Sequence, residues 1–149
     1  MLPHEALRAA AKLIEVGGWC RGEPGHTDHA RDAGGLLVPL YVGADRARIN
    51  PEAVQFTAYG AVAAIMGRER IVRIALMFDV LYRRALEVTG PPGGKNYVHP
   101  LEAYNATEGR TQAEVLAFLE AAAVECERIG DGPFPSPIPL PSKESMEGA

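Results

Sequence analysis

Five prolines alternate with other residues from Pro133 to Pro141, and this pattern divides the chain. Proline lacks a backbone N–H and fixes φ, so the segment cannot form a helix and favours extended polyproline II. We therefore predict a helical domain over residues 1–130 and a Pro-rich extended tail over residues 131–149. The large apolar residues between these prolines are Phe134, Ile138 and Leu140.

The charge balance limits what this chain can bind. Fifteen Lys and Arg face 19 Asp and Glu, a formal net charge of −4. We expect no nucleic-acid partner, because phosphate neutralisation needs clustered Lys and Arg. No run reaches the roughly 18 to 20 apolar residues of a membrane span, since Arg73 and Asp79 interrupt the best candidate. The first residues lack the basic-then-apolar order of a secretory signal. A cytoplasmic or virion protein is expected.

Apolar residues recur at helical spacing in four stretches. The first covers about residues 3–16, and Gly17-Gly18 should stop it. Trp19 follows directly and should fold back on this helix. The last stretch has the clearest start, because Thr111 and Glu114 have the spacing of a capping box.

The two middle stretches differ in their composition. Asn50 is a good N-cap and Pro51 a good first residue, which predicts a second helix from there to Gly67. The third helix, about residues 69–88, is apolar on most sides, which indicates burial among other helices or contact with a partner. Asp79 lies within it. Since an unpaired buried carboxylate is costly, we expect Asp79 to meet an arginine or a helix end.

Residues 20–50 lack helical periodicity. Residues 31–35 have the composition of a turn, and residues 36–42 form an apolar run that Pro39 confines to an edge strand. A small hairpin is the expected structure. The fold class is thus mainly α: a compact bundle of about four helices, with a small extended or hairpin segment after the first helix.

Two motifs resemble cofactor sites without meeting their requirements. His26, Asp28 and His29 lie close together, but zinc needs three or four ligands, usually from two short-spaced pairs, and a second pair is missing. Residues 90–96 resemble a phosphate loop, but the first glycine is misplaced and Asn96 replaces the hydroxyl residue. We expect neither a metal nor a cofactor.

Other candidate chemistry is weak. Cys20 and Cys126 are too few for a disulfide scaffold, so both should be buried thiols. No nucleophile elbow, HExxH or Cys-His signature is present in the sequence. Residues 44–84 hold seven arginines against four acidic residues. We interpret this stretch as a solvated face that balances the acidic ends, with a patch for an acidic partner or a nucleotide as the alternative.

Several short motifs occur in a recognisable order. They are Gly18–Gly22, Ala30–Ala33, Pro51–Val54, Ala58–Ala61, and Tyr104-Asn105 followed by Gly109–Leu116. Together, over about residues 4–127, they resemble an uncharacterised family of small helical proteins encoded in high-GC bacteria and their phages. The chain departs from the pattern of that family at Thr57, where the family has a cysteine, and at Ala106, where it tends to have an aspartate. The resemblance implies no activity.

The first functional hypothesis is a non-enzymatic interaction or accessory subunit of a larger assembly. It would dock on a protein partner or on a second copy through its apolar third helix and its tail, because alternating apolar and proline residues suit a groove on a partner or on the bundle itself. The tail residues expected to bind are Phe134, Ile138 and Leu140.

The alternative hypothesis is a small-molecule or nucleotide-binding protein, which would include an enzyme. Its pocket would lie where the polar residues of the resemblance meet. The same residues have a structural interpretation, in which Asn105 and Arg110 hydrogen-bond the irregular loop at Asp32. The residues proposed for this pocket are Trp19, Asp32, Asn105 and Arg110.

Overall fold

The computed structural model describes residues 1–22, 28–43, 48–90 and 100–130. Within these ranges the chain is mainly helical, as predicted, with small two-stranded hairpins after the first helix. In chain order the elements are α1 (Pro3–Gly17), β1 (His29–Arg31), β2 (Leu37–Pro39), β3 (Tyr41–Val42), β4 (Arg48–Ile49), α2 (Ala58–Arg68), α3 (Ile74–Thr89), α4 (Pro100–Ala106) and α5 (Gln112–Ile129).

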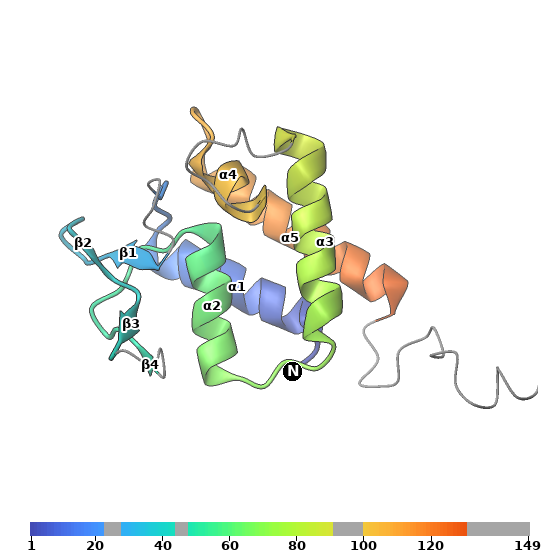
Figure 1. Cartoon of the computed structure of the whole chain (residues 1–149), viewed down its shortest axis with the longest axis horizontal. Helices are drawn as coiled ribbons and strands as arrows, with labels where there is room; N and C mark the ends of the chain where they lie inside the picture. The colour runs from blue at the N-terminus through green and yellow to red at the C-terminus, as the bar shows by residue number, and fades with distance from the viewer. Residues whose placement is uncertain (23–27, 44–47, 91–99, 131–149) are drawn as a thin grey trace, which may run out of the picture.

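The helices form two layers around one core. α1 and α5 run side by side in opposite directions, and α2 and α3 lie across them on the side nearest the viewer in Figure 1. α4 packs against α3 and α2 at one end, and the hairpins lie beyond the other side of α2. No helix in the described part of the chain is long and apolar enough to cross a membrane.

Local sequence signals set both ends of α1 and the start of α5. Glu5 at the third helical position accepts the Leu2 N–H over 2.8 Å, and Gly18 with φ +114° closes α1. At α5 the Thr111 hydroxyl accepts the Glu114 N–H over 3.2 Å, while the Glu114 carboxylate accepts the Thr111 N–H over 2.9 Å. The predicted capping box is therefore confirmed.

The predicted start of the second helix is wrong. α2 begins seven residues later than Pro51, at Ala58, with the Thr57 hydroxyl accepting the Gly60 N–H over 2.8 Å. Asn50 caps only a turn, in which its side-chain oxygen accepts the Glu52 N–H over 3.0 Å.

Tertiary pairing explains the late start of α2. The backbone of Phe56 donates to Gly18 O and accepts from Cys20 N, each over 3.0 Å, so this segment is extended beside the end of α1. Backbone groups that form these bonds cannot also form the first turns of a helix.

α3 also begins later than predicted, at Ile74, and ends at Thr89 as expected. Arg73, with φ +53°, lies in the left-handed region and separates α3 from the preceding turn. Asp79 is exposed, not buried among apolar neighbours as the sequence suggested. α4 was not predicted, because its seven residues are too few to show helical periodicity.

The hairpin prediction is confirmed in a small form. β1 pairs antiparallel with β2, with Arg31 opposite Leu37 and His29 opposite Pro39, and β3 pairs antiparallel with β4. Pro39 stands at the end of β2, where its missing N–H costs no ladder bond. The tail, the His26 end of the histidine cluster and residues 91–96 lie outside the described residues.

Charged side chains tie α5 to α3 in the other layer and to α1 in its own layer. Arg83 and Arg84 of α3 both donate to the carboxylate of Glu125 on α5, Arg84 over 2.6 Å. The Glu125 side chain is only 7% exposed. Arg8 of α1 binds Glu120 and Glu127 of α5 over 2.8 and 2.7 Å. These pairs fix how α5 sits against both of its neighbours.

Candidate functional site

Two of the four proposed pocket residues meet where α1 ends. Trp19 follows α1, and its indole Nε1 donates to Asn105 Oδ1 over 2.7 Å. The backbone N–H of Trp19 donates to the side chain of Gln112 at the start of α5, over 3.1 Å. Trp19 is half-buried against the core, so it folds back as predicted.

The Asn105 side chain uses its full hydrogen-bonding capacity inside the protein. Its oxygen also accepts the Ala58 N–H over 2.8 Å, and its amide donates to the carbonyls of Cys20 and Arg21 over 3.2 and 2.6 Å. An asparagine amide offers two donors and two acceptor lone pairs. All four are occupied in a residue that is 2% exposed, so Asn105 has none left for a ligand.

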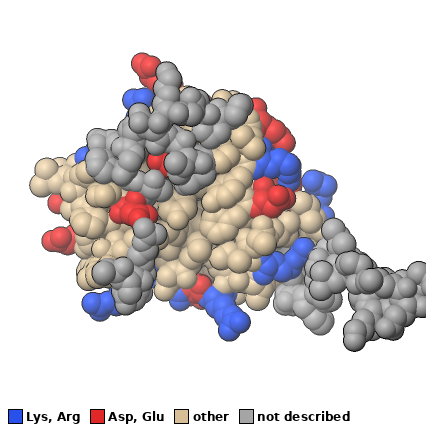
Figure 2. All heavy atoms as spheres, in the orientation of Figure 1, with Lys and Arg blue, Asp and Glu red and all other residues tan. Residues whose placement is uncertain are grey.

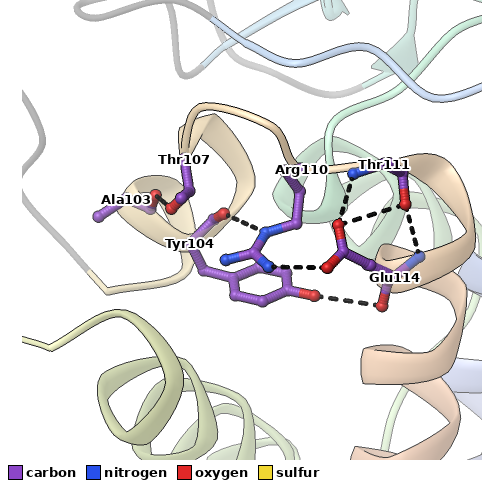
Figure 3. A network of polar contacts seen from close by, with 6 residues as sticks. All are labelled: Ala103, Tyr104, Thr107, Arg110, Thr111 and Glu114. Atoms are coloured by element: carbon purple, nitrogen blue, oxygen red, sulfur yellow. Dashed lines mark hydrogen bonds and ion pairs between the residues drawn. The ribbon is translucent and has the colours of Figure 1, made fainter.

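Arg110 lies nearby, in the turn that joins α4 to α5, and its side chain is only 10% exposed. Its Nε donates to Tyr104 O over 3.0 Å, and its guanidinium lies 4.0 Å above the centre of the Tyr104 ring. Glu114 Oε2 lies 3.7 Å from Arg110 Nη1. Figure 3 shows the guanidinium between the ring and this carboxylate.

The ring of Tyr104 forms the centre of this polar network. Its other contact is the Phe118 ring of α5, stacked with centroids 4.1 Å apart, and its hydroxyl donates to Glu114 O over 3.2 Å. Burial raises the pKa of the Tyr104 hydroxyl to about 12, so it stays protonated at neutral pH. The stack of guanidinium and two rings binds the α4–α5 turn to α5.

A hollow of about 310 Å³ lies beside this stack. Arg110 and Glu114 line one part of it, and the small side chains of Ala117 and Ala121 on α5 leave the space open. Its size falls at the lower limit of small-molecule pockets. Across the hollow, α3 contributes Arg84, Glu87 and Val88.

Asp32 lies elsewhere, in the turn between β1 and β2. Its Oδ1 accepts the N–H groups of Gly34 and Leu36, each over 2.9 Å, which is a turn-forming role. It lines a different hollow, with Glu52 and Val54. Trp19 and Asn105 thus bond each other directly. Arg110 lies in the turn between α4 and α5, and Asp32 lies in the hairpin of β1 and β2. Asn105 bonds the irregular loop at Cys20 and Arg21 and not at Asp32, and Arg110 donates to Tyr104 O instead of to the loop.

The sequence did not indicate the backbone partners of this junction. Arg21 donates to Ala106 O over 3.0 Å, which closes the loop after α1 onto the end of α4. Tyr104 belongs to one of the short motifs, but its contacts with Arg110 were not predicted. These partners are 85 and six residues apart in sequence. No periodic pattern reports such contacts, and the Tyr104-Asn105 motif was the only available signal.

The outer side of α3 carries an apolar surface, which we call the α3 stripe. Ile74 and Leu86 are 37% and 40% exposed, and Phe78 and Tyr82 are half-buried with ring centroids 5.5 Å apart. At four-residue spacing the side chains turn through an arc of about 120°. Figure 2 shows that the centre of this face, over α2 and α3, is largely uncharged and that charges gather round its edge. The α3 stripe consists of Ile74, Phe78, Tyr82 and Leu86.

The described residues offer little reactive chemistry. Both cysteines are buried and form no disulfide, and burial raises the pKa of the Cys20 thiol to about 11. Its sulfur lies 3.5 Å from Gln55 O. Among residues 1–22, 28–43, 48–90 and 100–130, no three His, Cys, Asp or Glu side chains are grouped to hold a metal ion. His26 is outside these ranges, so the metal prediction stays open.

The fold and the junction define a small, mainly helical protein whose first loop, α2 and α4 meet at one asparagine. The chain belongs to the family of unknown function DUF6197, whose model matches residues 1–125. The predicted resemblance to an uncharacterised helical family is confirmed to that extent. No match was found among curated proteins or among solved structures.

Proposed function

We propose that this protein is a non-enzymatic interaction subunit that binds a protein partner through the α3 stripe. The observation that carries the proposal is the row of exposed and half-buried apolar side chains at positions 74, 78, 82 and 86. Contiguous exposed apolar surface on a folded protein typically marks an interaction site.

The composition of the α3 stripe suits a protein interface. Interface cores are depleted in charge and enriched in aromatic side chains, and the α3 stripe offers Phe78 and Tyr82 as adjacent rings. Burying apolar surface stabilises a complex by about 25 cal/mol per Å² before the costs of association. The long side chains of Ile74 and Leu86 extend the surface along the helix, so a partner helix or extended segment has a continuous contact.

The state of the polar residues also supports a binding role over catalysis. Asn105 has its four hydrogen bonds inside the protein, and Arg110 is held by Tyr104 and Glu114. The Cys20 thiol, with its raised pKa, is a poor nucleophile at neutral pH. Nucleophilic catalysis requires an activated group, and burial raises the pKa of the Cys20 thiol instead of lowering it.

Leu86→Glu tests this proposal, because Leu86 is exposed and a charge there alters the α3 stripe without entering the core. The matched control is Val124→Glu, which changes a similarly exposed apolar residue on α5. Tagged wild-type protein is used to capture partners from its native cells, and each partner is identified, purified and titrated against all three proteins.

We expect Leu86→Glu to weaken the binding of one purified partner at least tenfold, and Val124→Glu to leave it within twofold. A second copy of the chain counts as a partner and is detected by light scattering. If every purified partner binds the Leu86→Glu protein as tightly as wild type, the α3 stripe is not the interface and the proposal fails.

One observation favours a second function, the binding of a small molecule or nucleotide. The hollow beside Arg110 presents two aromatic rings, two arginines and two glutamates around about 310 Å³. Ala117→Leu would fill the hollow, whereas Ala113→Leu changes an exposed alanine of the same helix outside it. A nucleotide or metabolite whose binding is lost in the first variant alone would support this function. Equal binding to both variants would contradict it.

The proposed setting is the cytoplasm of high-GC bacteria or a phage particle. The support is the order of the short motifs from Gly18–Gly22 to Gly109–Leu116, which resembles small proteins encoded there. In such a setting the partner would be a bacterial or phage protein of the same assembly.

A further inference from the structure

We infer that the occupant of the α3 stripe in the free protein is the Pro-rich tail of the same chain, with Phe134, Ile138 and Leu140 against it. This inference rests on the proposed function, because it concerns the same surface. It adds a form of regulation: a partner that binds the α3 stripe must first displace the tail.

The tail leaves the domain beside the N-terminal end of α3, where the α3 stripe begins. α5 ends at Ile129, and Gly130, with φ +105°, turns the chain out of the helix. Arg73, the residue before α3, donates from Nη1 to Gly130 O. The carbonyl of Gly130 therefore lies within reach of the side chain of the residue before Ile74, the first member of the α3 stripe.

The lengths of the tail and of the α3 stripe match. From Ile74 to Leu86 is 12 residues of helix, which rise about 18 Å. From Phe134 to Leu140 is six residues, which span about 19 Å in polyproline II. Residues 131–133 add about 9 Å of reach from the end of α5. Phe134 is then level with Ile74 or Phe78, and Leu140 with Tyr82 or Leu86.

The chemistry of the two surfaces is complementary. Residues 132–142 contain no charged side chain, so docking buries no unpaired charge. Proline-rich segments bind surfaces lined by aromatic rings, and Phe78 and Tyr82 provide two adjacent rings at the middle of the α3 stripe. The prolines also restrict the free tail, which lowers the entropy cost of ordering it.

The tether favours the tail of the same chain over that of a second copy. A segment joined by a short linker has an effective concentration in the millimolar range at a site it can reach. The linker here is residues 131–133, and both its starting point and its reach fit the first member of the α3 stripe. A second copy would have to exceed that concentration in solution.

Photo-crosslinking in the full chain tests this inference without any partner. p-Benzoylphenylalanine is placed at position 134 in one protein and at position 140 in another. Each is irradiated as an equal mixture of ¹⁵N-labelled and unlabelled chains. We expect crosslinks within one chain, from position 134 to residues 74–78 and from position 140 to residues 82–86. In the position-140 protein, Leu86→Glu should reduce the crosslink at least fivefold and Val124→Glu should leave it unchanged.

Three results would overturn the inference. Crosslinks mainly between labelled and unlabelled chains would make a second copy the occupant. Crosslinks outside α3, or the same yield in the Leu86→Glu protein, would place the tail elsewhere. The proposed function is tested by a different measurement, the binding of a purified partner to the Leu86→Glu protein. The failure of one proposal can therefore be distinguished from the failure of the other. If intramolecular crosslinks form but no partner binds the α3 stripe, the tail contact is supported and the proposed function is not.

Discussion

The indole N–H of Trp19 donates to Asn105 Oδ1 over 2.7 Å, and this bond joins residues 86 positions apart. Because Asn105 also bonds Ala58, Cys20 and Arg21, one side chain holds the loop after α1, the start of α2 and the end of α4. It connects three segments that are far apart in the sequence, and we call it a tertiary clip.

Asn105→Ala should destabilise the protein strongly. The substitution leaves the Trp19 indole, the Ala58 N–H and two carbonyls without their partner in a buried position. Each unsatisfied buried group costs about 1 to 3 kcal/mol, and partial rearrangement reduces the sum, so we expect a loss on the order of 3 kcal/mol in the free energy of unfolding. Urea denaturation followed by circular dichroism measures it.

Trp19→Phe is the matched variant, because it removes one of these four bonds and keeps an aromatic ring. It should cost about 1 to 2 kcal/mol, less than Asn105→Ala. If instead Asn105→Ala unfolds at the wild-type urea concentration, the asparagine is not the clip that the contacts indicate, and a ligand role becomes the better explanation.

Gly17→Ala should also be destabilising. An added Cβ would lie 2.2 Å from the carbonyl oxygen of Val54, because the segment before α2 runs against the end of α1. One of the two backbones must shift, which costs about 2 kcal/mol. Gly34→Ala is the control, since its Cβ would lie 3.5 Å from Asp32 Oδ1, an ordinary contact. Thermal unfolding of both variants compares them, and equal midpoints would contradict the close approach.

Glu125 should contribute to stability against acid. The hydrogen bond from Arg83, and then that from Arg84, holds the pKa of the Glu125 carboxyl below its ordinary value of 4.5. A pKa lowered by folding stabilises the protein above the unfolded value, and this contribution is lost as the pH falls through the folded pKa. Glu125→Gln should therefore lower the free energy of unfolding at pH 7 by about 1 kcal/mol, since solvent screens the half-exposed arginines.

The pH profile separates this effect from simple loss of packing. The difference between wild type and Glu125→Gln should shrink as the pH is lowered from 5 to 3, measured by urea denaturation at each pH. Glu108→Gln, at an exposed carboxylate in the turn before α5, should follow wild type throughout. A constant difference across this range would mean that the charge of Glu125 does not contribute.

Both thiols should be protected in the folded state. Burial raises the pKa of the Cys20 thiol to about 11, and Cys126 is fully buried in the core. Because only the thiolate attacks, native protein at pH 8 should react with a disulfide reagent at least about 100-fold more slowly than protein in denaturant. Two equivalents should react after unfolding. A rapid native equivalent would indicate a reactive cysteine and would reopen the question of catalysis.

The elements predicted well were those with local signals. Thr111 and Glu114 cap α5 as expected, and the glycines after residue 16 end α1, because caps and stops depend on residues within one helical turn. Asn50 and Pro51 were an equally good local signal and were wrong. Their helix is replaced by backbone pairing of Val54 and Gln55 with Arg31 of β1. Phe56 pairs in the same way with Gly18 and Cys20 after α1, and no local pattern reports these contacts.

The candidate pocket shows the same division. The short motifs contain Trp19, Asn105 and Arg110. Trp19 bonds Asn105 directly, and Arg110 lies nearby in the turn between α4 and α5. Asp32 is separated from them, because its carboxylate caps the turn between two short strands. Asp79 was expected to meet an arginine or a helix end. It is exposed, and the pKa of Arg83 is raised by its bond to Glu125 and further by the charge of Asp79. The faces of α3 depend on where α4 and α5 pack, and helix periodicity alone does not fix that when most sides are apolar.

The sequence by itself determined a mainly helical domain, the caps of its first and last helices, and a proline segment that cannot be helical. These follow from backbone chemistry that acts over a few residues. Only the tertiary structure decided that Asn105 uses all its side-chain hydrogen bonds inside the protein and that Arg110 stacks on Tyr104. It also decided that α3 leaves an apolar stripe beside the end of α5. Those outcomes depend on contacts between residues far apart in sequence, which the packing of the helices sets.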